Sequence, residues 1–87
     1  MFSHVEQDKR APVKLNKVID RAIDIAANQI KHRATLVKVF GNIPRVMGNE
    51  GRLSQVFLNI LVNAVHAIEE GNVGHNQIRV RTWTEGG

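Results

Sequence analysis

Residues 49–67 read NEGRLSQVFLNILVNAVHA, and their apolar positions recur with the period of an α-helix. Asn49 suits the N-cap, because its side-chain oxygen can accept a hydrogen bond from the free amides of the first turn. Gly71 and Asn72 form a common helix stop, so we predict a helix over about residues 50–70. Apolar side chains cover most of its circumference, which is typical of a buried helix. Its main apolar face consists of Leu53, Val56, Phe57, Ile60, Leu61, Ala64, Ala67 and Ile68.

One narrow arc of this helix is polar. It contains Gln55, Asn59, Asn63 and His66, which fall on one side at helical spacing. A buried amide without a partner costs about 1–3 kcal/mol, so these side chains need something to bond to. Either the arc meets water or a neighbouring backbone, or it faces a cleft that holds a polar ligand. In the second case the asparagine oxygens would suit a hydrated Mg²⁺ that completes its shell with phosphate oxygens.

The sequence on either side predicts a second helix and short strands. Apolar residues recur at helical spacing from Leu15 to Ile30, and residues 35–40, 45–47 and 77–84 have strand character. In the last strand, Ile78 and Val80 alternate with Arg79 and Arg81, which indicates one covered face. The expected fold class is α+β, with two helices packed on one face of a small mixed sheet. Residues 1–13 are expected to form a linker from an upstream region.

The composition fits one small soluble domain. Of its 87 residues, 43% are hydrophobic and 23% are charged, and none is cysteine, so disulfides and thiolate metal sites are excluded. No apolar run reaches the roughly 18 residues of a transmembrane helix, and the N-terminus lacks the apolar core of a signal peptide. We therefore expect a cytoplasmic location and no membrane contact within this segment. The net charge of +4 suits an anionic partner.

Residues 49–67 also resemble the N box of sensor histidine kinases, commonly written D-x-x-R-L-x-Q-V-x-x-N-L-L-x-N-A-x-x-A. Asn49 stands where the family often has Asp, and Ile60 replaces a Leu; nearly every other defined position matches. The resemblance covers the first half of the family's ATP-binding domain (HATPase_c, of the GHKL superfamily). It implies an incomplete α/β sandwich over residues 14–87. The family's later G1 box, D-x-G-x-G, is absent, as are the F and G2 boxes.

The resemblance also implies ligands and partners. Asn63 would be a Mg²⁺ ligand, Asn59 would lie beside the metal and the phosphates of ATP, and His66 would occupy a position where many kinases carry Lys or Arg. In related ATPases the residue matching Asn59 is a Glu that activates water, whereas an amide cannot take a proton at neutral pH. This difference favours transfer of the γ-phosphate to a protein histidine. The implied partners are a histidine-bearing dimerisation domain and a response regulator.

The segment by itself is expected to be inactive and to bind ATP weakly or not at all, because it lacks the adenine-binding box. The missing strands would leave a sheet edge unpaired, which invites a homodimer or strand exchange. Two other functions stay open: a non-catalytic protein-interaction domain on the same scaffold, and a basic nucleic-acid-binding module. The spread of the positive charges and the lack of an aromatic stacking platform argue against nucleic acid.

Overall fold

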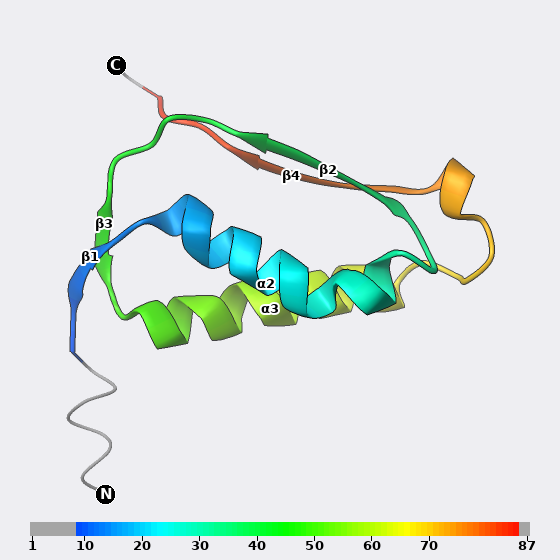
Figure 1. Ribbon diagram of the computed structural model, residues 1–87, viewed down its shortest axis with the longest axis horizontal. Helices are drawn as coiled ribbons and strands as arrows, with labels where there is room; N and C mark the ends of the chain where they lie inside the picture. Colours follow the sequence, from blue (N-terminus) through cyan, green and yellow to red (C-terminus); the bar gives the residue numbers. More distant parts are fainter. Residues whose placement is uncertain (1–8, 86–87) are drawn as a thin grey trace, which may run out of the picture.

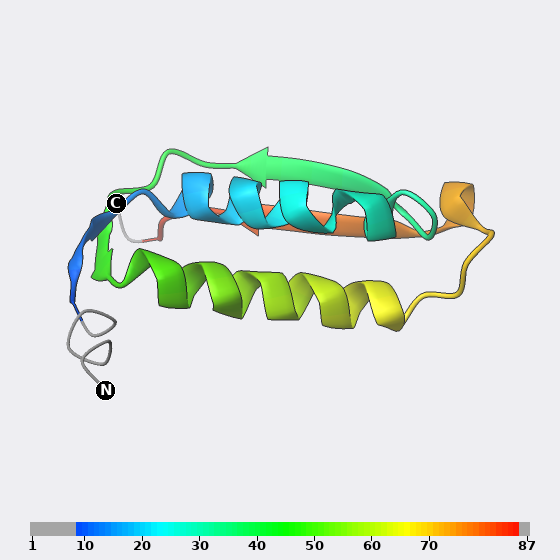
Figure 2. The ribbon, with the colours of Figure 1, turned by 60° about the horizontal axis from the view of Figure 1, so that its bottom comes forward.

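The structure, a computed structural model, describes residues 9–85. Its centre is a pair of helices, α2 (Leu15–Ile30) and α3 (Glu50–His66). The two helices pack side by side and run in the same direction (Figures 1 and 2). The predicted bounds of the first helix are confirmed. Its apolar stripe is buried and consists of Val18, Ile19, Ala22, Ile23, Ala26 and Ile30.

Each helix is followed by a strand that runs back along it (Figure 1). β2 (Thr35–Phe40) and β4 (Gln77–Thr82) pair in parallel, with Leu36 opposite Ile78, and the 3-10 helix η1 (Val73–His75) precedes β4. Both helices lie on one side of this strand pair (Figures 1 and 2). Ile78 is buried and Arg79 is exposed, so the prediction of one covered face is confirmed.

A second strand pair lies at the end of the molecule where both helices begin (Figure 1). β1 (Ala11–Val13) pairs antiparallel with β3 (Val46–Gly48). The α+β class is confirmed, but the strands form two two-stranded sheets and not one mixed sheet. Residues 41–45 join β2 to β3 and thus carry the chain from one sheet to the other; they include Pro44, which has no amide hydrogen to donate. Of the predicted linker, residues 1–8 lie outside the described residues.

The core is shared by α2, α3 and β4. Leu61 and Val65 of α3 and Ile78 of β4 join the buried residues of α2. The rest of α3 departs from the expectation of a buried helix, because Val56 and Ile60 of its predicted apolar face are 50% and 56% exposed. Among the described residues α3 is packed on one side, against α2 and the strand pair, and this leaves part of its apolar surface, including Val56 and Ile60, in water.

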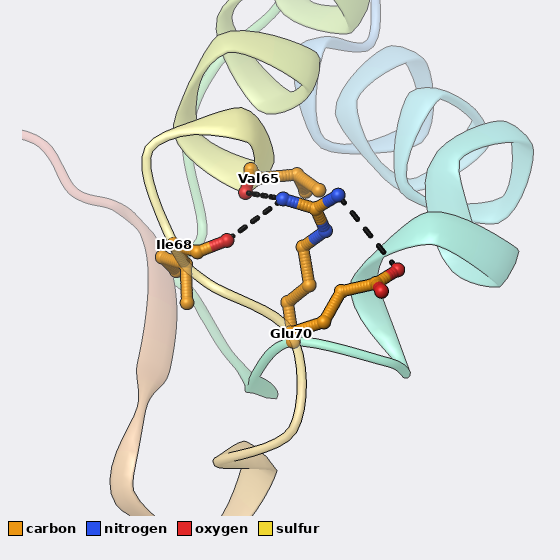
Figure 3. A network of polar contacts seen from close by, with 4 residues as sticks. Val65, Ile68 and Glu70 are labelled. Atoms are coloured by element: carbon orange, nitrogen blue, oxygen red, sulfur yellow. Dashed lines mark hydrogen bonds and ion pairs between the residues drawn. The ribbon is translucent and has the colours of Figure 1, made fainter.

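Specific polar contacts hold both ends of α3. At the start, Asn49 is the N-cap, as predicted: its side chain accepts a hydrogen bond of 3.0 Å from the amide of Arg52. At the end, the helix stops at His66, four residues before the predicted position. Nη1 of Arg33 donates to the carbonyls of Val65 and Ile68 over 3.4 and 2.8 Å. Figure 3 shows these two carbonyl groups turned toward the guanidinium group. In a longer helix these carbonyls would accept hydrogen bonds from amides of the next turn; here they accept from Arg33 instead.

None of the helices described between residues 9 and 85 is long and apolar enough to cross a membrane.

Candidate functional site

The four polar residues predicted to share one arc do lie on the same exposed face of α3. Gln55, Asn59, Asn63 and His66 are all exposed. Nε2 of Gln55 donates to Oδ1 of Asn59 over 3.1 Å, so the structure brings these two amides into contact. Asn63 lies one turn further on, and among residues 9–85 its side chain has no hydrogen-bond partner. The arc therefore faces solvent in the structure, where a ligand could also reach it.

Two hollows lie along other parts of α3. One, of about 380 Å³, lies at the start of α3 beside β3 and is lined by Met47, Arg52, Leu53 and Val56 among others. The second, of about 320 Å³, lies between α3 and β4 and is lined by residues that include Phe57, Ile60, Ala64, Ile78 and Val80. The lining of both hollows is more apolar than polar. None of the four residues of the polar arc lines either hollow.

Sequence reasoning missed the exposure of Val56 and Ile60, which adjoin Gln55 and Asn59 on the helix surface. The sequence pattern assigned Val56 and Ile60 to the buried face of α3. Periodicity gives the position of a residue around the helix, but it does not give how much of the helix surface a neighbouring element covers. Both residues lie at the margin of the predicted apolar face, next to the polar arc, and this position could have indicated that they are exposed. The outward face of α3 is therefore a polar row bordered by exposed aliphatic side chains.

The donor set limits the kind of cation that this face can hold. No cluster of three or more His, Cys, Asp or Glu side chains suited to a metal occurs within the described part of the chain. Asn59 and Asn63 offer neutral amide oxygens, which suit a hard ion such as Mg²⁺ that keeps several waters and takes charge-bearing ligands from a phosphate group. The residues present therefore fit Mg²⁺ bound together with a polyphosphate better than Mg²⁺ alone.

We compared the chain with known protein families and with known proteins. No family model matches the chain. It is 32% identical over 83 residues to the sensory histidine kinase/phosphatase NtrB of Rhodobacter capsulatus, and the match includes 94% of this chain. The chain spans 22% of the length of that relative. The chain is therefore a distant homologue of a sensory histidine kinase/phosphatase.

Proposed function

We propose that this chain is the N-box part of the ATP-binding domain of a two-component sensor histidine kinase, and that the polar arc of α3 contacts Mg-ATP. The observation that carries the proposal is the arc itself: Asn59 and Asn63 lie one turn apart on an exposed helix face. The distant homology to a sensory histidine kinase/phosphatase supports the same assignment.

In this proposal Asn63 supplies an amide oxygen to Mg²⁺, and Asn59 contacts the phosphates beside it. The metal, when bound, shields the charge of the phosphates and orients them. Asn59 cannot accept a proton at neutral pH, so it does not activate water for hydrolysis. The γ-phosphoryl group of the intact ATP is then available for transfer to a histidine of a dimerisation domain, with ADP as the leaving group, and from that histidine to a response regulator in a cytoplasmic signalling protein. His66, on the next turn, would be a further contact to the phosphates.

The direct test is a titration of the ¹⁵N-labelled chain with ATP, with and without Mg²⁺, followed by NMR. We expect Mg-dependent shifts at Asn59, Asn63 and His66, with a dissociation constant above about 1 mM because the adenine-binding box is absent. Asn63→Ala should abolish these shifts, whereas the matched control Asn28→Ala, on the exposed side of α2, should keep them. Shifts that leave α3 unaffected would overturn the proposal.

A chimera tests the activity. This chain would replace the segment that it matches in the Rhodobacter capsulatus kinase, and autophosphorylation with labelled ATP would be measured. The proposal is supported if the chimera is active, if the Asn63→Ala substitution in the chimera abolishes this activity, and if Asn28→Ala does not. A folded chimera with equal activity in both variants contradicts the role of Asn63.

A non-catalytic interaction domain is the second candidate function. The exposure of Val56 and Ile60 beside the polar arc favours it, because adjoining exposed aliphatic side chains are more typical of a protein contact than of open surface. The same titration separates the two functions, since an interaction domain would show no Mg-dependent response to ATP.

A further inference from the structure

A third hollow, of about 250 Å³, lies between β1, α2 and the start of α3, and none of the residues of the polar arc lines it. Its lining includes four basic side chains and one carboxylate, namely Lys14, Lys17, Arg21, Arg45 and Glu50. The whole chain has twelve basic and eight acidic residues, so positive charge is concentrated at this hollow. All the residues that line it fall between positions 12 and 50, so the hollow does not involve the last strand.

The basic side chains reach the hollow from different segments. Lys17 and Arg21 are one turn apart on α2, so they lie on the same face of the helix. Lys14 directly precedes this helix. Arg45 lies between Pro44 and β3, and the proline ring and the pairing of β3 with β1 limit the movement of its backbone. The fold therefore gathers cations that are far apart in the sequence.

Most of this charge is not neutralised by the chain itself. Arg21 lies 3.7 Å from Glu50, but both side chains are largely exposed (71% and 61%), so this ion pair is weak. No ion pair between residues 9 and 85 involves Lys14, Lys17 or Arg45. The first turn of α2 contains no acidic residue. Like charges that are held close together repel, and an anion bound between them offsets this repulsion.

The size and the lining of the hollow favour a small anion that carries phosphate groups. Its volume is below the roughly 300–1,000 Å³ of pockets that enclose drug-sized molecules. No aromatic side chain lines it, so a nucleobase has nothing to stack on. A guanidinium group presents paired donors that match phosphate oxygens, and a lysine ammonium adds a point charge. A short chain of phosphate groups therefore fits better than a nucleoside or a nucleic-acid strand.

We infer that this hollow binds a short polyphosphate, of the inorganic diphosphate or triphosphate type, without a metal ion. Arg21 and Arg45 donate to the phosphate oxygens, and Lys14 and Lys17 balance the remaining charge. The site is separate from the polar arc, because Asn59 lies nine residues after Glu50 on α3, about 13 Å along the helix axis. The inference does not depend on the proposed nucleotide site.

A titration of the ¹⁵N-labelled chain with inorganic triphosphate tests the site, at constant ionic strength and with EDTA to remove Mg²⁺. We expect shifts centred on Lys17, Arg21 and Arg45 and none at Asn59 or Asn63. Sulfate should bind about tenfold more weakly, because it carries fewer charges. ATP in EDTA should bind no more tightly than triphosphate, because the hollow offers nothing to the base.

Three results of these titrations would overturn the inference. Equal affinity for sulfate and triphosphate would show that the hollow only attracts negative charge. Tighter binding of ATP would show that the nucleoside is recognised. A hexaglutamate peptide that binds more tightly than triphosphate would identify an acidic polypeptide as the occupant.

Two variants of opposite effect test the residues. Arg45→Gln should weaken binding of triphosphate about fivefold, as expected when one exposed charge contact is lost. Its matched control is Arg79→Gln, because Arg79 is exposed and does not line this hollow. Glu50→Gln should strengthen binding by a similar factor, because it removes the carboxylate at the hollow and releases Arg21.

The control for Glu50→Gln is Glu69→Gln, which changes the net charge equally at an exposed position beyond the other end of α3. Because Glu50→Gln is expected to improve binding, a loss of folding cannot imitate its effect. Affinity that is unchanged in Arg45→Gln, or that changes equally in Glu50→Gln and Glu69→Gln, would overturn the inference.

Discussion

The side chains of Gln55 and Asn59 are joined one turn apart on α3, with Nε2 of Gln55 donating to Oδ1 of Asn59 over 3.1 Å. The oxygen of Asn59 uses one of its two lone pairs in this bond, and its NH₂ group remains able to donate to a ligand. A donor suits a phosphate oxygen, and a free amide oxygen suits a metal. The pair therefore favours the proposed division of roles, with Asn59 beside the phosphates and Asn63 on the Mg²⁺.

The first prediction concerns this pair. Gln55→Ala should increase the mobility of the Asn59 side-chain amide, because the bond that orients it is removed, and NMR relaxation of that NH₂ group measures the change. The free energy of unfolding should change by less than about 0.5 kcal/mol, as for other exposed pairs one turn apart. Gln29→Ala on α2 is the control. Unchanged relaxation of the Asn59 amide would show that Gln55 does not position it.

The second prediction concerns the start of α3. Asn49→Ala should lower the free energy of unfolding by about 1 kcal/mol, because the N-cap bond to the amide of Arg52 is lost. Asn49→Asp should keep most of the stability, since a carboxylate oxygen also caps. Urea denaturation followed by circular dichroism measures both variants, with Asn28→Ala as the mid-helix control. An equal loss in Asn49→Ala and Asn49→Asp would contradict a capping role.

The third prediction concerns the end of α3, where Arg33 donates to the carbonyl of Ile68 over 2.8 Å and lies 3.8 Å from Glu70 (Figure 3). Arg33→Met should cost about 1–3 kcal/mol of stability, because it leaves helix-end carbonyls without their charged donor. Glu70→Gln should cost less than about 1 kcal/mol, because the ion pair is largely exposed. Denaturation and amide exchange in the last turn of α3 separate the two effects. A larger loss in Glu70→Gln would reverse this ranking.

The fourth prediction concerns the end of β2. A Cβ atom at Gly41 would lie 2.7 Å from the carbonyl oxygen of Thr82, which belongs to the backbone and cannot move aside easily. Gly41→Ala should therefore destabilise the protein by about 1–3 kcal/mol, as overpacking does. The control is Gly74→Ala, where an added Cβ meets nothing within 4 Å. Equal thermal midpoints for the two variants would rule out the predicted clash.

The fifth prediction concerns pH. The hydrogen bond from Lys38 to Asp20, 2.6 Å long, raises the pKa of Lys38 above its usual value of 10.5. The stabilisation is present below the unfolded pKa and is lost as pH rises through the higher folded value, so it disappears only above about pH 10.5. Asp20→Asn should lower the pKa of Lys38 in an NMR titration, and Asp24→Asn should lower it less. The reverse order of effects would show that the hydrogen bond is not the main cause.

Local signals in the sequence were sufficient for most of the secondary structure. The period of apolar residues located α2, the side chain of Asn49 located the start of α3, and the alternation at Ile78 and Val80 identified the covered face of β4. The common arc of Asn59 and Asn63 was also predictable. Each of these properties depends on residues within one or two turns of each other, or within one strand.

Contacts between residues far apart in the sequence determine the end of α3 and the pairing of the strands. The end of α3 at His66 depends on Arg33, which lies in the turn between α2 and β2 and donates to carbonyls 32 and 35 residues away. The pairing of β1 with β3 depends on where residues 41–45 lead the chain. The spacing of apolar residues within one segment does not predict contacts of this kind.

The sequence by itself determined which residues form helices and strands and which side chains share a face. Only the tertiary structure decided that α3 is covered on one side, so that its polar arc, Val56 and Ile60 meet solvent. Periodicity fixes the direction in which a side chain leaves its helix, but the exposure of the side chain depends on which other segment packs against that face of the helix. That is a property of several segments together, because burial requires a neighbour.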